Sequence, residues 1–368
     1  MTVNPFTPTF GEIPLHLAGR DREINDILYV LDGAVSAPSR TAIFVGARGC
    51  GKTALLTYLG REAEARGWIC VNVGCVKGMR EDIFQQTAAA IEELFPQEEE
   101  IHITGFSLGQ LVSVDWEKDK RYLPNWRTRM TRLLEVLEEH DVGLVITVDE
   151  VNPNLEELIL LASDYQLFIR ESRKVSLLMA GLPAKVSALL NDPNTTFLRR
   201  ASQYTLDPVA DEEVKIAFLR TIEDSGKLIE SSALEDAVRS IAGFPYMMQL
   251  IGFRSWQLTG SREMIRAEDV QEGIKLAKSD FKERVLKNTV RDLSDVDLEF
   301  LEAMLADDGP SRLSDIRDRM GKSEKYAARY RMRLIEFGII ESAGRGKIRF
   351  AIPGLREYIS AEYITTKE

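Results

Sequence analysis

The sequence has few cysteines and histidines and lacks a long apolar run. Its three cysteines, Cys50, Cys70 and Cys75, are odd in number and irregularly spaced, which argues against a disulfide framework and fits a reducing cytoplasm. Three scattered histidines give no Cys/His zinc pattern. No stretch approaches twenty unbroken apolar residues, and the start has no basic stretch leading into an apolar run. We therefore expect neither a membrane span nor a secretory signal.

The chain is 368 residues long, which is too long for one core and suits two or three domains. It carries 47 Lys and Arg against 58 Asp and Glu, a formal net charge of −11. Taken alone, this acidity argues against binding to nucleic acid.

Short apolar, β-rich stretches alternate with stretches in which apolar residues recur at helical spacing. The strand-like stretches are 41–45, 68–73, 143–148, 175–180 and, as a fifth candidate, 203–206. This alternation predicts a parallel α/β sheet covered on both faces, with ligands bound beyond the carboxyl ends of its strands. Residues 101–116 break the alternation and indicate a β-hairpin-like insertion, either a solvent-facing flap or a contact for a partner or DNA. Residues 211–287 show only helical spacing.

A complete G-x-x-x-x-G-K-[S/T] phosphate loop follows the first strand and opens a helix. The candidate nucleotide-binding residues are Gly46, Ala47, Arg48, Gly49, Cys50, Gly51, Lys52 and Thr53. Gly49 and Gly51 allow the backbone to turn successive N–H groups toward an anion, and the helix N-terminus adds partial positive charge. Lys52 is expected to reach the β- and γ-phosphates, and Thr53 to bind Mg²⁺. The pattern predicts ATP or ADP binding.

Asp149 and Glu150 follow the third strand, where a Walker B element is expected. Asp149 would bind Mg²⁺, directly or through water, and Glu150 would polarise the attacking water. The other interpretation is a helix N-terminus with acidic residues that suit its dipole.

With these motifs in place, the chain resembles the AAA+ ATPases, particularly the archaeal-type group and the branch related to origin-recognition initiators. Residues 17–24 resemble the box whose backbone embraces adenine, which implicates Ala18 and Gly19. Residues 197–201 occupy the place of the family's arginine finger, so Arg199 or Arg200 would reach a neighbouring subunit's nucleotide. The resemblance thus implies a homo-oligomer or a protein partner that completes the site. Alternatively, both arginines are solvated or paired with acids.

Two positions depart from the family pattern. The fourth strand ends in Ala180-Gly181-Leu182-Pro183 without a polar sensor 1 residue, an ending similar to ATPases that assist transposition and secretion. Residues 243–248 carry no sensor 2 arginine, and Arg254 further along is a weak substitute. Missing sensors indicate slow or partner-stimulated hydrolysis, or a nucleotide-controlled switch.

Residues 293–363 have the pattern of a winged helix, with three helices followed by two strands around Gly344-Arg345-Gly346. Between residues 311 and 350 there are eleven Lys and Arg against five Asp and Glu, so this segment has a charge of 11 − 5 = +6 in an acidic chain. A basic module of this kind is what contact with double-stranded DNA requires. The candidate DNA-binding residues are Lys322, Lys325, Tyr326, Arg329, Arg333, Arg345 and Lys347. Protein contacts or intramolecular regulation are the alternative for this module.

The sequence therefore predicts an AAA+ P-loop α/β domain over residues 1–206, an α-helical lid over 207–290 and a winged helix over 291–368. The expected function is that of a cytoplasmic ATP hydrolase whose nucleotide state controls a DNA-binding winged helix, as in initiators and transposition helpers. The alternative is a signalling or defence-type regulatory ATPase that uses the winged helix for protein contacts or autoinhibition.

Overall fold

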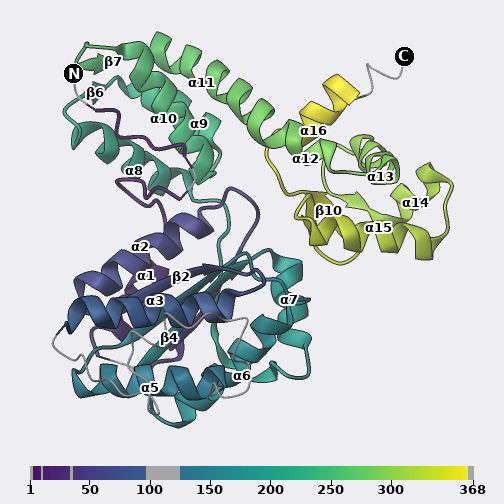
Figure 1. The fold of residues 1–368 in the computed structure, drawn as a ribbon. Helices are drawn as coiled ribbons and strands as arrows, with labels where there is room; N and C mark the ends of the chain where they lie inside the picture. The colour runs from purple at the N-terminus through teal and green to yellow at the C-terminus, as the bar shows by residue number, and fades with distance from the viewer. Residues whose placement is uncertain (1–2, 10, 34–35, 97–124, 364–368) are drawn as a thin grey trace.

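The computed structural model describes residues 3–9, 11–33, 36–96 and 125–363 (Figure 1). The expected insertion at residues 101–116 lies outside these ranges. Within them, no helix has the length and apolar character needed to cross a membrane.

A five-stranded sheet forms the N-terminal part of the molecule. Its order is β2-β3-β4-β1-β5, and all neighbouring strands are parallel. The strands are β1 (Thr41–Val45), β2 (Ile69–Gly74), β3 (Leu144–Asp149), β4 (Val175–Gly181) and β5 (Ser202–Thr205). All five predicted strands are confirmed to within one or two residues. Every residue of β4 is buried, because helices cover both faces of a parallel sheet.

Helices pack on both faces of this sheet and form two hydrophobic cores. α1 and α2 cover one face, and α3, α5 and α6 cover the other. The helices are α1 (Asp21–Leu31), α2 (Lys52–Ala65), α3 (Met79–Leu94), α5 (Trp126–Glu139), α6 (Glu156–Arg170) and α7 (Pro183–Asn191), with short 3₁₀ turns η1 (Pro38–Arg40) and η2 (Thr196–Arg200).

Residues 207–290, here called the helical unit, follow the sheet. The main helices are α8 (Asp211–Glu223), α9 (Ser231–Ile241), α10 (Pro245–Thr259) and α11 (Ala267–Phe281). The expectation of purely helical structure is wrong at two places, because β6 (Leu228–Ile229) and β7 (Met264–Ile265) pair in parallel. Strands of two residues are too short to produce a recognisable period in the sequence.

α11 continues through a π-helical turn, η3 (Lys282–Leu286), into α12 (Lys287–Arg291), and leads to residues 291–363, here called the C-terminal unit (Figure 1). Its sheet is antiparallel, with the order β8-β10-β9. The elements are α13 (Asp295–Leu305), β8 (Ser311–Arg312), α14 (Leu313–Met320), α15 (Glu324–Glu336), β9 (Ile340–Ser342), β10 (Lys347–Phe350), α16 (Leu355–Tyr358) and the π turn η4 (Ile359–Tyr363). The three helices and two strands expected here are present.

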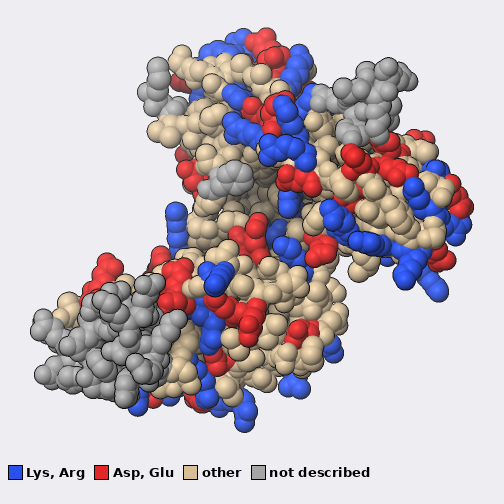
Figure 2. All heavy atoms as spheres, turned by 45° about the vertical axis from the view of Figure 1, so that its right-hand side comes forward, with Lys and Arg blue, Asp and Glu red and all other residues tan. Residues whose placement is uncertain are grey.

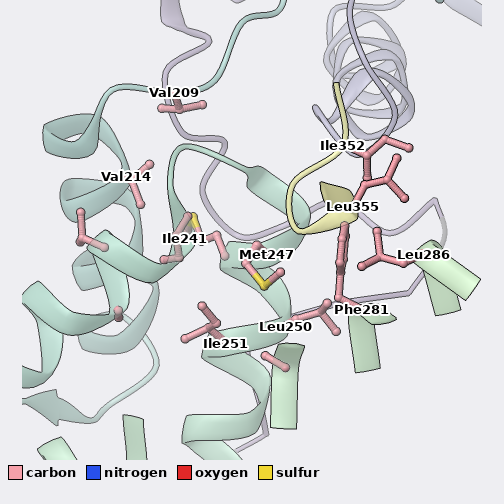
Figure 3. Packing of buried hydrophobic residues seen from close by; sticks show 14 of the residues in the cluster. Val209, Val214, Ile241, Met247, Leu250, Ile251, Phe281, Leu286, Ile352 and Leu355 are labelled. Carbon is pink, nitrogen blue, oxygen red and sulfur yellow. The ribbon is translucent and has the colours of Figure 1, made fainter. Parts of the chain in front are cut away.

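The helical unit and the C-terminal unit share one hydrophobic core. Figure 3 shows Ile352 and Leu355 of the C-terminal unit next to Leu286 and Phe281. All four side chains are at most 5% exposed. The expected boundary at residue 290 therefore crosses a continuous apolar contact, which restrains the two units relative to each other.

Candidate functional site

The phosphate loop lies at the carboxyl end of β1, between that strand and α2. Gly49 (φ +80°) and Gly51 (φ +90°) adopt left-handed conformations, which cost glycine little. α2 begins at Lys52, so its N-terminal N–H groups lie at the loop. This is the backbone geometry that a phosphate cradle requires.

The Lys52 side chain curls back over the loop. Its Nζ donates to the carbonyl oxygens of Gly46 (3.0 Å) and Ala47 (2.8 Å) and lies 3.9 Å from Sγ of Cys50. Cys50 is 4% exposed, so its side chain packs in the interior, whereas Arg48 is exposed. The ammonium is therefore held within the loop, where a bound phosphate would meet it.

Thr53 in the first turn of α2 and Asp149 at the end of β3 are joined by a hydrogen bond. Thr53 Oγ1 donates to Oδ2 of Asp149 over 2.6 Å. These two oxygens fit Mg²⁺, which usually binds one or two protein ligands and completes its octahedron with phosphate oxygens and water. Among the described residues, no group of three or more His, Cys, Asp or Glu could hold a metal ion.

Glu150 occupies a strained backbone position directly after β3. Its φ is +54°, in the left-handed region that costs a non-glycine residue about 1–2 kcal/mol. Its backbone N–H donates to Oδ1 of Asp149 over 2.8 Å, which helps to hold this conformation. Strain of this kind is commonly found at functional sites, where it fixes the direction of a side chain.

The expected adenine box packs against the start of the helical unit. Ala18 is 9% exposed, and Gly19 has φ +60°. A Cβ on Gly19 would lie 2.7 Å from both Cγ1 of Val209 and Oε2 of Glu213, so only glycine fits here.

Arg20, which the sequence pattern does not single out, is 7% exposed beside this box. Its guanidinium donates to the carbonyl oxygens of Cys50 (3.4 Å) and Asp207 (3.0 Å). Arg20 thereby joins the phosphate loop to the start of the helical unit. Nothing in the local sequence distinguishes this arginine from its exposed neighbour Arg22.

The N-terminus of α10 lies over the phosphate loop. A Cβ on Gly49 would lie 3.7 Å from Cβ of Tyr246 and 3.8 Å from Cδ1 of Phe244, and a Cβ on Gly51 would lie 3.8 Å from Pro245. The helical unit therefore contacts the loop through apolar side chains.

The arginines expected near the nucleotide take different positions. Arg199 and Arg200 are both exposed at the end of η2, and Arg199 Nε donates to the carbonyl oxygen of Leu190 over 2.8 Å. Arg254 forms a two-point ion pair with Asp280 on α11, with distances of 2.7 and 2.9 Å. The guanidinium that the sequence offers as a sensor 2 substitute is therefore paired within the helical unit.

The candidate DNA-binding residues differ in how far their side chains are engaged with the rest of the C-terminal unit. Lys325, Arg329, Arg345 and Lys347 are exposed. Arg333 is also exposed, but its Nε lies 3.1 Å from both carboxylate oxygens of Asp297, whose side chain is 0% exposed.

The remaining two candidates lie together at the start of α15. Lys322 Nζ lies 4.0 Å from Oε1 of Glu299 and 5.7 Å from the centre of the Tyr326 ring. The Tyr326 ring in turn lies 4.9 Å from that of Tyr330. Tyr326 is therefore half-buried in side-chain contacts, while Lys322 remains exposed.

Comparison with known proteins gives one family model, a domain of unknown function (DUF8462), which matches residues 283–359. Curated proteins give no match. Among solved structures, the chain is similar to the Walker-type ATPase PABY2304 of Pyrococcus abyssi, with a TM-score of 0.64, 15% identity and coverage of 94% of this chain and 96% of that one. It is also similar to the ORC2 protein of Aeropyrum pernix, solved as ADPNP–ADP complexes, with a TM-score of 0.62, 14% identity and coverage of 98% and 97%. For Cdc6p of Pyrobaculum aerophilum, the TM-score is 0.50 at 15% identity, with coverage of 98% of this chain and 97% of that one.

These similarities extend over nearly the whole chain and show its fold. The five-stranded parallel sheet, its phosphate loop and the surrounding helices form the AAA+ P-loop fold found in archaeal ORC and Walker-type ATPases. The resemblance drawn from the motifs is thereby confirmed at the level of the fold. At 14–15% identity, the similarity does not extend to activity.

Proposed function

We propose that this chain is a Mg²⁺-dependent ATPase in which bound nucleotide controls the C-terminal unit. The observation that carries the proposal is the 2.6 Å contact between Thr53 and Asp149 beside a phosphate loop with left-handed Gly49 and Gly51. In this proposal Thr53 and Asp149 hold Mg²⁺ beside the phosphate cradle, and Glu150, one residue away, polarises the attacking water. The ADPNP–ADP complexes of the similar ORC2 protein support the same nucleotide chemistry.

We assign the AAA+ domain to residues 1–206, the lid to 207–290 and a winged helix to 291–368. Helices α13–α15 followed by the β9–β10 pair support the last assignment. The family model over residues 283–359 supports a separate unit there. The charge of +6 between residues 311 and 350 favours double-stranded DNA as its partner.

The protein is proposed to act in the cytoplasm. Its hydrolysis of ATP is proposed to be slow until a partner completes the site. Support comes from β4, which ends in Gly181 without a polar sensor residue, and from the pairing of Arg254 with Asp280. The exposed Arg199 and Arg200 remain the candidates for reaching the nucleotide of a neighbouring copy. Comparing ATP turnover of Arg199→Ala and Arg200→Ala at rising protein concentration identifies which of them acts. Turnover of several ATP per second by the isolated wild-type protein would refute slow hydrolysis.

A gel-shift with a DNA duplex, with and without ATP, tests the proposal as a whole. Wild type should change its DNA affinity when ATP is added, whereas Lys52→Ala should bind DNA without responding to ATP. Direct nucleotide titration of both proteins separates loss of nucleotide binding from loss of coupling. If wild type binds no nucleotide in the presence of Mg²⁺, the proposal fails.

One observation favours a second function, a regulatory ATPase that uses the C-terminal unit for intramolecular or protein contacts. α15, the helix expected to read DNA, packs against α7 of the AAA+ domain, and its Arg333 is engaged by the buried Asp297. Nucleotide-driven assembly that is indifferent to DNA would favour this function. Hydrolysis stimulated by DNA would favour the first.

A further inference from the structure

Three segments of the C-terminal unit meet around a surface groove of about 350 Å³: β8 with the start of α14, the β9–β10 turn, and the start of α15. Each segment contributes groups to its lining. Arg312 lies at the end of β8, Arg317 on α14, and Arg345 with Gly346 in the β9–β10 turn, while Glu324 lies on the first turn of α15. Leu313 N–H donates to the carbonyl oxygen of Gly346 over 3.1 Å, which fixes the turn against the start of α14. The groove is therefore built by the fold and not by one flexible side chain.

The charge of this groove is positive. Three arginines against the one glutamate among the described lining residues give 3 − 1 = +2. Arg317 is paired with Asp318 at 2.6 Å, but Arg312 and Arg345 are exposed and have no ion-pair partner within the described part of the chain. Two guanidinium groups that line the groove are thus available to an anion.

We propose that this groove holds a backbone phosphate of duplex DNA, with Arg312 and Arg345 as the principal contacts. The inference rests on the proposed DNA-binding function and locates its contact surface. A guanidinium offers paired N–H donors that match two phosphate oxygens.

Charge beyond the groove favours a polyanion over a small phosphate compound. Lys347 lies beside the turn, and Lys325 and Arg329 are exposed on α15. Figure 2 shows Lys and Arg side chains lying in a row along one edge of the C-terminal unit.

The contact surface differs from the one that the sequence predicts. Arg312 and Arg317 are not among the residues that the sequence pattern indicates, whereas Arg333 near the end of α15 is engaged by Asp297. DNA contacts therefore centre on β8, the start of α14 and the β9–β10 turn, together with the N-terminal half of α15. This leaves the contact between α15 and α7 in place.

The test measures the affinity of the full chain for a fluorescent DNA duplex over a series of salt concentrations. Arg312→Ala/Arg345→Ala should lose roughly tenfold in affinity for each arginine, since hydrogen bonds to charged groups are strong. The slope of log K against log salt concentration should fall by about two, because each arginine neutralises about one phosphate charge. The control Arg61→Ala/Arg239→Ala removes two exposed arginines from α2 and α9, and should keep the wild-type affinity and slope.

Two further variants separate a phosphate contact from general charge. Arg312→Lys/Arg345→Lys should keep the slope but lose part of the affinity, because lysine lacks the paired donors. Glu324→Gln should bind DNA more tightly. Thermal unfolding shows whether each variant is folded, and the single Arg345→Ala variant, at an exposed turn, serves if a double variant is not.

The outcomes distinguish the two levels of the proposal. If wild type binds no duplex even at low salt, the DNA-binding function fails. If wild type binds duplex and Arg312→Ala/Arg345→Ala matches it in affinity and slope, the groove assignment alone fails. Calorimetric binding of pyrophosphate that depends on both arginines, without binding of duplex, would replace DNA by a small anion and overturn the assignment.

Discussion

Leu182, directly after β4 of the five-stranded sheet, lies against Gly338 of the C-terminal unit. A Cβ on Gly338 would lie 3.1 Å from Cδ2 of Leu182, and Gly338 itself is left-handed with φ +69°. Leu182 directly follows β4, whose last residue, Gly181, accepts a hydrogen bond from the backbone N–H of Gly46 over 3.3 Å. The start of the phosphate loop, the end of β4 and the end of α15 thus form one chain of contacts.

Leu182→Ala should weaken this connection. Because Leu182 is half-buried, we expect a loss of about 1 kcal/mol in stability, and faster hydrogen exchange in α7 and α15. ADP should then alter exchange in α15 less than it does in wild type, as measured by mass spectrometry. Leu258→Ala, at a leucine of α10 that is 38% exposed, is the control. An undiminished effect of ADP on α15 would show that coupling follows another path.

Glu150 is expected to contribute to hydrolysis at the expense of stability. Glu150→Gln keeps the backbone strain and should lower ATP turnover by a factor of about 10²–10⁴ with little change in nucleotide affinity. Glu150→Gly should lose the same activity yet gain about 0.4–1 kcal/mol in stability, since glycine tolerates φ +54°. Turnover assays and urea denaturation measure the two effects. A destabilised Glu150→Gly variant would contradict the interpretation of this backbone as strained.

A structural feature can be predicted from this sequence when its cause lies within a few neighbouring residues. The strands of the main sheet are predictable because each is a short apolar run, and the phosphate loop because its glycines and lysine have fixed spacing. The pairing of β6 with β7 depends on two residues in each strand and leaves no pattern. Contacts between distant segments leave none either. Helical spacing places Arg333 on α15, but the buried Asp297 that holds it lies 36 positions earlier.

Phe6 fastens the N-terminal segment to the helical unit. It is 1% exposed, its ring centre lies 5.1 Å from that of Phe218, and a Cβ on Gly252 would lie 2.3 Å from it. Phe6→Ala should therefore cost about 3–5 kcal/mol in the free energy of unfolding, measured by urea denaturation. Val3→Ala, at a side chain that is 86% exposed, should change nothing. A loss below about 1 kcal/mol for Phe6→Ala would show that this segment is dispensable.

Asp307 and Arg319 join the end of α13 to α14, and their ion pair should make stability depend on pH. Both terminal nitrogens of Arg319 lie 2.6 Å from the carboxylate oxygens of Asp307. Hydrogen bonds from Arg319 and then Ser311 lower the pKa of Asp307 to about 2. An unfolded aspartate has a pKa of about 3.9, so the stabilisation is complete above about pH 4 and is lost as the pH falls through about 2.

Asp307→Asn should consequently lower Tm by about 1–2 °C at pH 7, as expected for a partly exposed pair. The difference from wild type should shrink below pH 4 and vanish below about pH 2, because wild-type Asp307 is then protonated and has lost its charge as well. Calorimetry at several pH values measures this convergence. Asp308→Asn, at the exposed neighbouring aspartate, should leave Tm unchanged at each pH. A deficit for Asp307→Asn that stays constant down to pH 2 would mean that packing, and not the charge of Asp307, stabilises this corner.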